Sequence, residues 1–193
     1  MVKGEIHIRQ MINDINTGQI DLFKDIVEMN KRLVYHVVSR MESNATVRED
    51  LCQDVFLKVY KNLHSFKFES KLSSWIARIA YNTCISHIEK KKTPLFEDHS
   101  PEEFTMDDIE IHEREPYQIV EDDDVSGIIR REIEKLPMQF RVILTLFHIE
   151  SMGYEEISEV LEVPVGTVSS YVYRARKLLK DRLLNKYKKE DVT

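Results

Sequence analysis

Hydrogen-bond donors and cations share one stripe of a helix that the sequence predicts to begin at about Val165–Thr167. Residues three and four apart lie on the same face of a helix. By this spacing the polar stripe carries Ser169, Ser170, Tyr173, Arg174 and Lys177. A helix that presents such donors, without bulky apolar surface, can enter the major groove of DNA and bind base edges and phosphates. The chemistry that this stripe predicts is recognition, with no covalent bond made or broken.

The flanking residues predict a helix-turn-helix around that stripe. Tyr154–Leu161 has apolar residues three and four apart, and Glu162-Val163-Pro164 ends this helix because the residue before a proline disfavours the helical conformation. Between Tyr171 and Lys189, eight Lys or Arg stand against one acid. Many helical hairpins carry charged faces for solubility alone, so DNA binding and simple solvation both remain open on this pattern. The second helix also has an opposite, apolar stripe at Val168, Val172, Ala175 and Leu179.

No constellation in the chain is typical of an enzyme or a metal centre. The seven histidines are scattered without ligand spacing, and neither a glycine-rich phosphate loop nor a GxSxG motif occurs. The pair Asp107-Asp108 and the run Asp122–Asp124 have no neighbours that would desolvate them. Cys52 and Cys84 lie far apart without a CxxC motif, which favours free thiols in a reducing cytoplasm. We therefore expect no catalytic residue, no metal and no cofactor.

The composition predicts an all-α protein. Among 193 residues there are five glycines and five prolines, with 32% charged and 42% hydrophobic residues, as expected of soluble helices with few turns. No apolar run approaches the roughly 20 residues that cross a bilayer, and the N-terminus lacks the apolar core of a signal peptide. We expect a cytoplasmic protein without membrane insertion.

The negative charge is concentrated in one segment. Residues 97–124 contain thirteen Asp or Glu and a single basic residue, Arg114, for a net charge of −12, so the rest of the chain carries +6. This segment has too little apolar surface to fold alone. We expect two small helical domains, residues 1–93 and 125–193, joined by an acidic linker, 94–124. The linker is either a solubilising tether or part of the control of activity.

The first domain is predicted to contain four helices, Glu5–Ile15, Asp21–Glu42, Thr46–Leu63 and about 73–92. In the third helix, Leu51 and Val55 face inward together with Leu57 or Lys58, which leaves a polar outer face.

The segment between the third and fourth helices, His64–Lys71, is predicted to be a polar loop with two exposed aromatics. Ser73, Ser74 or a neighbour can cap the helix that follows. In that helix, Trp75 is favoured as a core residue over a contact to a nucleic-acid strand.

An ordered set of short motifs extends through the second domain. The set comprises Leu136-Pro137, Arg141, the apolar run Val142–Phe147, Tyr154-Glu155-Glu156-Ile157, Pro164-Val165-Gly166-Thr167-Val168 and Arg174-Ala175-Arg176. Together these motifs resemble the C-terminal domain of the extracytoplasmic-function (ECF) group of bacterial sigma-70 factors. The resemblance implies a helix-turn-helix that recognises the minus-35 promoter element and contacts the flap of RNA polymerase.

The first domain carries the same resemblance independently. The run EDLCQDVFLKVYKNL, residues 49–63, is similar to the helix with which this family docks on the clamp helices of the largest polymerase subunit. The residues Phe66, Trp75, Arg78, Ile79, Ala80 and Asn82 resemble the family line that opens and captures the minus-10 element. There a flipped base enters a pocket, which must compensate for a few kcal/mol of lost stacking.

The resemblance implies roles for individual residues. Polymerase contacts fall on Asp50, Gln53, Asp54 and Phe56. Minus-10 contacts fall on Phe66, Lys67, Phe68, Glu69, Ser70, Lys71 and Asn82 for bases, and on Arg78, Lys90, Lys91 and Lys92 for phosphates. Minus-35 contacts fall on Ser169, Ser170, Tyr173 and Arg174 for bases, and on Thr167, Tyr171 and Lys177 for phosphates.

One departure from the family line concerns Val168-Ser169-Ser170-Tyr171, where hydroxyls stand at positions that are often basic. It affects the promoter sequence that is read but not the mode of binding.

The resemblance therefore favours an alternative sigma factor. Its partners are core RNA polymerase and promoter DNA, and an anti-sigma factor is a further candidate partner. Two rival hypotheses are a stand-alone helix-turn-helix regulator and a nucleic-acid enzyme such as a recombinase. The first usually needs a dimerisation helix, which is not evident, and the second needs a catalytic site on a rigid scaffold.

Overall fold

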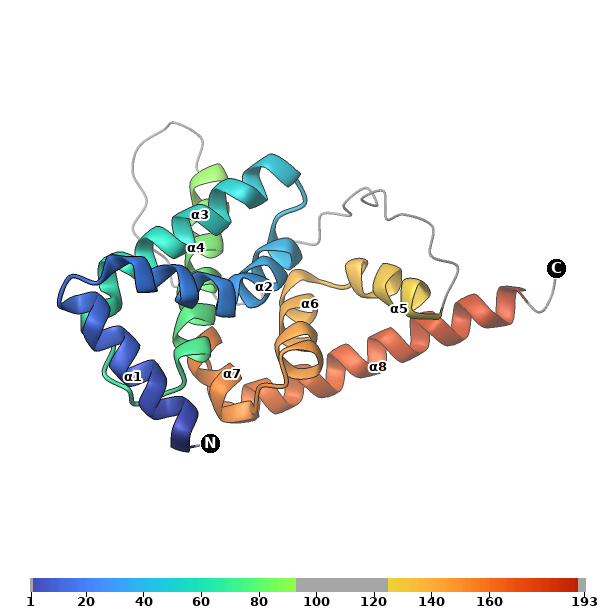
Figure 1. Cartoon of the computed structure of the whole chain (residues 1–193). Coiled ribbons are helices and arrows are strands. Elements are labelled where there is room, and N and C mark those ends of the chain that lie inside the picture. Colours follow the sequence, from blue (N-terminus) through green and yellow to red (C-terminus); the bar gives the residue numbers. More distant parts are fainter. Residues whose placement is uncertain (1, 93–124, 191–193) are drawn as a thin grey trace, which may run out of the picture.

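The computed structural model describes residues 2–92 and 125–190, and the expected linker, residues 94–124, lies outside the described residues. Two groups of helices are present (Figure 1). The first contains α1 (Val2–Asn16), η1 (Ile20–Leu22), α2 (Phe23–Met41), α3 (Ala45–Asn62), η2 (Leu63–Ser65) and α4 (Leu72–Lys92). The second contains α5 (Val125–Glu134), α6 (Met138–Leu144), a π-helical turn η3 (Thr145–Ile149), α7 (Tyr154–Leu161) and α8 (Val165–Glu190).

In the first group, α2 is central because its apolar face is broad enough to pack on several helices at once. It contacts both α3 and α4, and Val34, Val37 and Val38 are fully buried there. Gly18 separates α1 from η1 with φ +112°, a conformation that an L side chain rarely adopts. Asn44 caps α3, since its side-chain oxygen accepts a hydrogen bond from the amide of Val47 at 3.1 Å.

In the second group, α7 and α8 form the predicted helix-turn-helix, with the predicted boundaries of α7. Glu162 ends α7 in the left-handed conformation, φ +56° and ψ +38°, and α8 begins three residues later. The apolar stripe of α8 packs on α6, and that of α7 packs on α8 and α4, with Ile157, Val168 and Ala175 fully enclosed. The long α8 then runs past α6 and α5 towards the C-terminus (Figure 1).

The two groups are packed together rather than separate, and their buried apolar side chains form one continuous cluster. One contact joins α2 to α6 and η3. There Arg40 donates from Nε to Thr145 Oγ1 at 3.0 Å and pairs with Glu134, and Arg141 donates from Nε to the carbonyl of Arg40 at 3.0 Å. The other contact joins α4 to α7 (Figure 1).

Two local expectations are wrong, and the capping alternatives for α4 are narrowed to a neighbour of the two serines. Leu57 does not face inward, because its side chain is 55% exposed on the outer side of α3. Phe66 is not an exposed loop aromatic: it is buried, and its ring packs on Phe68 and Trp75 with centroids 4.8 and 5.3 Å apart. Ser73 and Ser74 do not cap α4, because that helix begins at Leu72. For Leu57 and Phe66, contacts between segments, which spacing along one helix or loop does not encode, decide whether the side chain is buried.

Candidate nucleic-acid interface

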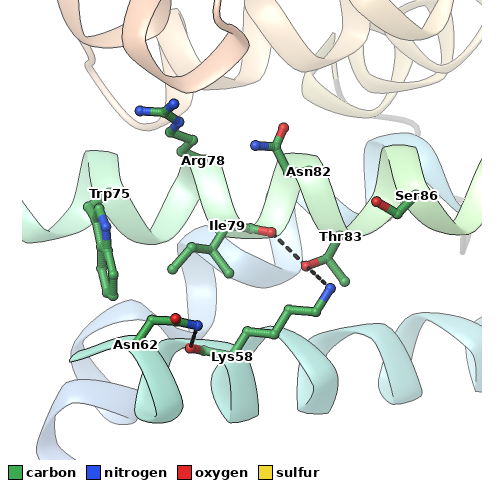
Figure 2. A pocket seen from close by; sticks show the side chains of 8 residues that line it. All are labelled: Lys58, Asn62, Trp75, Arg78, Ile79, Asn82, Thr83 and Ser86. Atoms are coloured by element: carbon green, nitrogen blue, oxygen red, sulfur yellow. Dashed lines mark hydrogen bonds between the residues drawn. The ribbon is translucent and has the colours of Figure 1, made fainter. Parts of the chain in front are cut away.

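A pocket of about 280 Å³ lies between α3 and α4. Figure 2 shows Lys58 and Asn62 approaching from α3, while Arg78 and Asn82 project from the far side of α4 towards the second group of helices. Two of the predicted minus-10 residues, Arg78 and Asn82, therefore line one pocket. Its complete lining is Lys58, Asn62, Trp75, Arg78, Ile79, Asn82, Thr83 and Ser86.

The polar groups of this pocket are partly fixed by hydrogen bonds (Figure 2). Lys58 Nζ donates to Thr83 Oγ1 at 3.1 Å, and that hydroxyl donates to the carbonyl of Ile79 at 2.7 Å. Asn62 Nδ2 donates to the carbonyl of Lys58 at 2.8 Å, which leaves its carboxamide oxygen to accept a further bond. Lys58 and Asn62 were missed by sequence reasoning, although both are polar and four residues apart on α3.

The loop before α4 is built on an aromatic cluster. Phe66 is buried under it, Phe68 is half-buried with the Arg9 guanidinium 4.3 Å from its ring centroid, and Trp75 is half-buried. Phe66 thus supports the loop, whereas Lys67, Glu69 and Lys71 are exposed. The arrangement agrees with the expectation that Trp75 packs on the core, and it also lets this side chain form one wall of the pocket.

Carboxylates of α7 pair with two of the predicted minus-10 cations. Glu156 Oε1 lies 3.0 Å from Lys71 Nζ and accepts a hydrogen bond from Ser74 Oγ at 3.1 Å. Glu162 Oε1 accepts from Arg78 Nε at 2.7 Å. Burial raises the pKa of Glu156, but bonds from the Gly153 amide, Lys71 and Ser74 outweigh it, so the net pKa is lowered. Glu156 is therefore held as an anion.

The lysines at the end of α4 lie near a second acidic group. Lys91 Nζ contacts Glu42 Oε2 at 2.9 Å, while Lys90 is exposed and Lys92 is the last residue of the helix. Glu42 is buried, which raises its pKa, but the Asn44 amide and Lys91 outweigh this effect and lower it overall. The structure thus gives Lys91 a structural partner in addition to its predicted role near phosphates.

The predicted polymerase surface lies on the outer side of α3. Asp50, Gln53 and Asp54 are exposed at helical spacing, and the exposed Leu57 continues the same stripe. Phe56 is half-buried against the core and supports the stripe from beneath. The sequence pattern had left open whether Leu57 or Lys58 faces the core, and both are exposed.

The predicted recognition face of α8 is open. Ser169, Ser170, Tyr173, Arg174 and Lys177 are all exposed, with Tyr173 at 70%. Thr167 and Tyr171 are half-buried, and the ring of Tyr171 meets Phe140 edge-on at 6.0 Å. Burial of Val168 and Val172 on the opposite stripe directs these donors to solvent. The helix therefore presents the donors and cations that major-groove recognition needs.

Among the residues that the structure describes, no group of three or more His, Cys, Asp or Glu side chains could hold a metal ion. Burial raises the pKa of the Cys84 thiol to about 12 and also raises that of Cys52, so neither is an activated nucleophile. None of the helices in the described ranges combines the length and apolar character that spanning a membrane requires.

Comparison with known families agrees with both halves of this arrangement. Residues 26–93 match the family model described as Sigma-70 region 2, and residues 126–179 match the model described as Sigma-70, region 4. The pocket, the aromatic cluster and the α3 stripe fall in the first match, and the helix-turn-helix falls in the second.

Curated relatives match over nearly the whole chain. The ECF RNA polymerase sigma factor SigW of Bacillus subtilis is 34% identical over 183 residues, covering 93% of this chain and 98% of the relative. The ECF RNA polymerase sigma-E factor of Escherichia coli is 28% identical, covering 90% and 92%.

Solved structures share the fold. CnrH, in complex with the cytosolic domain of CnrY, matches with a TM-score of 0.62 at 17% identity, covering 91% of this chain and 96% of that one. The sigma factor RpoE of Bartonella quintana, in complex with the anti-sigma factor NepR, matches with a TM-score of 0.61 at 22% identity, covering 83% and 96%.

Proposed function

This chain belongs to the ECF group of sigma-70 factors, which bind core RNA polymerase and direct promoter-specific initiation of transcription, and we propose how its surfaces divide that task. The α3–α4 pocket takes a flipped base of the minus-10 element. The exposed face of α8 reads the minus-35 element in duplex DNA. The outer stripe of α3 docks on the polymerase clamp helices. The observation that carries the proposal is that Trp75, Arg78 and Asn82, three positions of the family's minus-10 line, all belong to the lining of this one pocket.

The proposed base site combines the contacts that a flipped base needs. A base taken out of the duplex loses stacking worth a few kcal/mol, and a protein recovers it with a flat apolar wall and hydrogen bonds to the base edge. Trp75 and Ile79 supply apolar surface, while the carboxamides of Asn62 and Asn82 can both donate and accept. Arg78, at the rim, is placed for a phosphate of the same strand.

The proposed minus-35 reader is the α8 face. Arg174 is the side chain best suited to a bidentate contact with a guanine, and Ser169, Ser170 and Tyr173 add single hydrogen bonds. Lys177, one turn further along, is placed for a phosphate. Eight Lys or Arg lie between Tyr171 and Lys189 in and beyond this face, although the whole chain has a net charge of −6.

The proposed polymerase surface pairs charge with one apolar anchor. Asp50 and Asp54 flank Gln53, and Leu57 adds exposed apolar area that an interface would bury. A small apolar anchor inside a polar rim is the usual anatomy of a protein interface.

Promoter selection with matched variants tests the assignment of these three surfaces to the minus-10 element, the minus-35 element and core polymerase. Libraries randomised in both elements are transcribed by core polymerase with Asn82→Ala, Arg174→Ala or Asp54→Ala. We expect Asn82→Ala to relax selection in the minus-10 element only, and Arg174→Ala to relax it by about tenfold at one minus-35 position. Asp54→Ala should weaken core binding without changing the selected sequence. Controls are Asn16→Ala, Arg32→Ala and Asp25→Ala, which change exposed residues of α1 and α2. Loss of selection in the wrong element would refute the assignment.

The setting of the proposed function is the cytoplasm, where bacterial core polymerase works, and the chain needs no catalytic activity of its own there. An anti-sigma factor is a reasonable further partner, because the solved relative RpoE was found with the anti-sigma factor NepR. To test this part of the proposal, the tagged chain is purified together with any untagged partner that it binds. That partner is then added to run-off transcription by core polymerase and this chain, which an anti-sigma factor should abolish.

A further inference from the structure

Four side chains from α1, α4 and the loop between η2 and α4 form one continuous stack that ends at the proposed base pocket. The guanidinium carbon Cζ of Arg9, on α1, lies 4.3 Å from the ring centroid of Phe68. The ring of Phe68 packs on Phe66 with centroids 4.8 Å apart, and Phe66 packs on Trp75 at 5.3 Å. Because Trp75 lines the pocket proposed for a flipped base, the stack connects α1 to that pocket.

Phe68 has a backbone conformation that a bulky side chain rarely adopts. Its φ is +60°, in the left-handed region, and it starts the bend at residues 68–70 of the loop 66–71. This conformation is unfavourable by itself, so it persists only where surrounding contacts hold it, and such residues gather at functional sites. Two ring contacts of Phe68 oppose the cost, one with Arg9 and one with Phe66.

The apolar face of α1 places Arg9 beside this loop. Met11, Ile12 and Ile15 are buried in the core, and α1 contacts η2, the turn that leads into the loop (Figure 1). Arg9 is exposed and lies three residues before Ile12, at the edge of the apolar face. A guanidinium can lie flat on an aromatic ring while its N–H donors stay in water, so the contact desolvates little charge. The match to Sigma-70 region 2 begins at residue 26, so α1 lies before it.

The bend at Phe68 decides where the loop presents its predicted minus-10 contacts. Lys67, Glu69 and Lys71 flank this bend and are exposed. If Phe68 leaves the left-handed region, the chain direction changes at the bend and these side chains change direction with it. The apparent affinity of a site falls with the fraction of molecules that are in its binding-competent conformation. A contact that holds Phe68 therefore contributes to binding of the single strand.

We propose that Arg9 is a positioning residue of the minus-10 reader, which acts through Phe68 by holding the loop 66–71 in the conformation that binds single-stranded promoter DNA. This role rests on the proposed function of the α3–α4 pocket. Loss of the guanidinium removes one of the contacts that offset the unfavourable φ of Phe68, so the competent fraction of molecules falls. Arg9 then affects the minus-10 element without contacting a base.

A double-mutant cycle at Arg9 and Phe68 tests this role in the complex with core polymerase. Arg9→Gln removes the guanidinium, and Phe68→Leu removes the aromatic face while it keeps an apolar side chain against Phe66. Arg32→Gln is the matched control, because Arg32 is exposed on α2 and the same charge is lost. Each protein, saturated with core polymerase, is titrated onto a promoter that the wild type selects. Promoter opening is measured by the permanganate reactivity of unpaired thymines in the minus-10 element.

We expect Arg9→Gln to weaken promoter opening about two- to fivefold, which is the range of an exposed cation–π contact. Minus-35 selection, and promoter opening by Arg32→Gln, should stay at the wild-type level. In the Phe68→Leu background, Arg9→Gln should have no further effect, because the two residues act as one unit. An equal loss in both backgrounds would mean that Arg9 contacts DNA directly and would overturn the positioning role. No loss in the wild-type background would overturn it as well.

Trypsin cleavage after Lys67 measures the same loop in the absence of DNA. Lys67 is exposed and directly precedes Phe68, and cleavage within a folded loop requires local opening. Mass spectrometry follows the fragments that begin with Phe68. Their rate of release should rise about two- to fivefold in Arg9→Gln and should not change in Arg32→Gln. Equal rates in the wild type and Arg9→Gln would show that Arg9 does not hold the loop.

Failure of the positioning role and failure of the proposed function give different results. If the wild type and Arg9→Gln open the selected promoter equally, the positioning role fails and the proposed function of the pocket stands. If the wild type with core polymerase selects no minus-10 element, the proposed function fails, whatever the rate of cleavage after Lys67.

Discussion

Replacement of Arg141 by methionine should destabilise the fold more than any surface change of the same kind. Arg141 is 5% exposed and donates from Nε to the carbonyl of Arg40, and from Nη1 to the carbonyls of Glu134 and Leu136, at 2.9–3.1 Å. Methionine fills a similar volume without a donor, so two buried acceptors and one half-buried acceptor lose their partner, at about 1–3 kcal/mol for each buried one. Because the substitution also removes a buried charge that was costly to desolvate, we expect a net loss of about 3 kcal/mol.

Urea unfolding followed by far-ultraviolet circular dichroism at pH 7 measures this loss directly. With an m value of about 2 kcal/mol/M, the midpoint should fall by about 1.5 M. Arg32→Met is the matched control, because Arg32 is exposed on α2, and it should change the unfolding free energy by less than about 0.5 kcal/mol. The unfolding free energy of Arg141→Lys should lie between those of the two methionine variants, because one ammonium group cannot reproduce the several donors of a guanidinium.

A midpoint for Arg141→Met equal to that of Arg32→Met would refute the reasoning. It would mean that the three carbonyls find water or other donors, and that the arginine of this family motif has no structural role in the joint between α2 and α6. A large fall in m with an unchanged midpoint would instead indicate loss of the cooperative transition.

Three further changes have defined outcomes. Cys84, whose pKa is raised to about 12, should resist iodoacetamide at pH 8 in the folded protein and react only after unfolding. Mass spectrometry measures the labelling, and rapid labelling of the folded protein would contradict the burial of this thiol. Folding lowers the pKa of Glu42. The stability that its carboxylate adds to the folded protein is therefore fully present above the ordinary pKa of 4.5, and it is lost as the pH falls through the pKa of the folded state. Urea unfolding of Glu42→Gln should therefore show a smaller loss of stability between pH 7 and pH 3.5 than the wild type, and an equal loss would count against the assignment. Phe66→Ala should lower the unfolding free energy by about 3 kcal/mol because the ring is buried, whereas an exposed base reader would leave stability unchanged.

Much of the secondary structure follows from the sequence, because apolar spacing alone sets it. The bounds of α7 and the start of α8 agree with the predicted pattern. The recognition face is also predictable, since the buried stripe of Val168 and Val172 fixes which side of α8 is exposed.

The remaining features depend on contacts between distant segments, which periodicity does not encode. Leu57 is exposed because none of the helices in residues 2–92 and 125–190 covers that side of α3, and Phe66 is buried because Phe68 and Trp75 enclose it. The pairs between α4 and α7 join residues 84 positions apart, Arg78 and Glu162. A pattern read along one helix assigns each of these charges to solvent.

The same limit applies to Arg141. The family motif marks its position just before an apolar run, but its role follows from three carbonyls, which come from α2, from the end of α5 and from the turn between α5 and α6. The spacing of residues along one helix therefore could not predict the hydrogen bond by which Arg141 joins the two groups of helices.

Run-off transcription with purified core RNA polymerase on promoter-library DNA, with and without this protein, tests the central claim most directly. The account predicts start sites that appear only when both components are present and that share two upstream elements. If the protein binds duplex DNA alone but never redirects core polymerase, the claim is contradicted, and a stand-alone helix-turn-helix regulator becomes the better explanation.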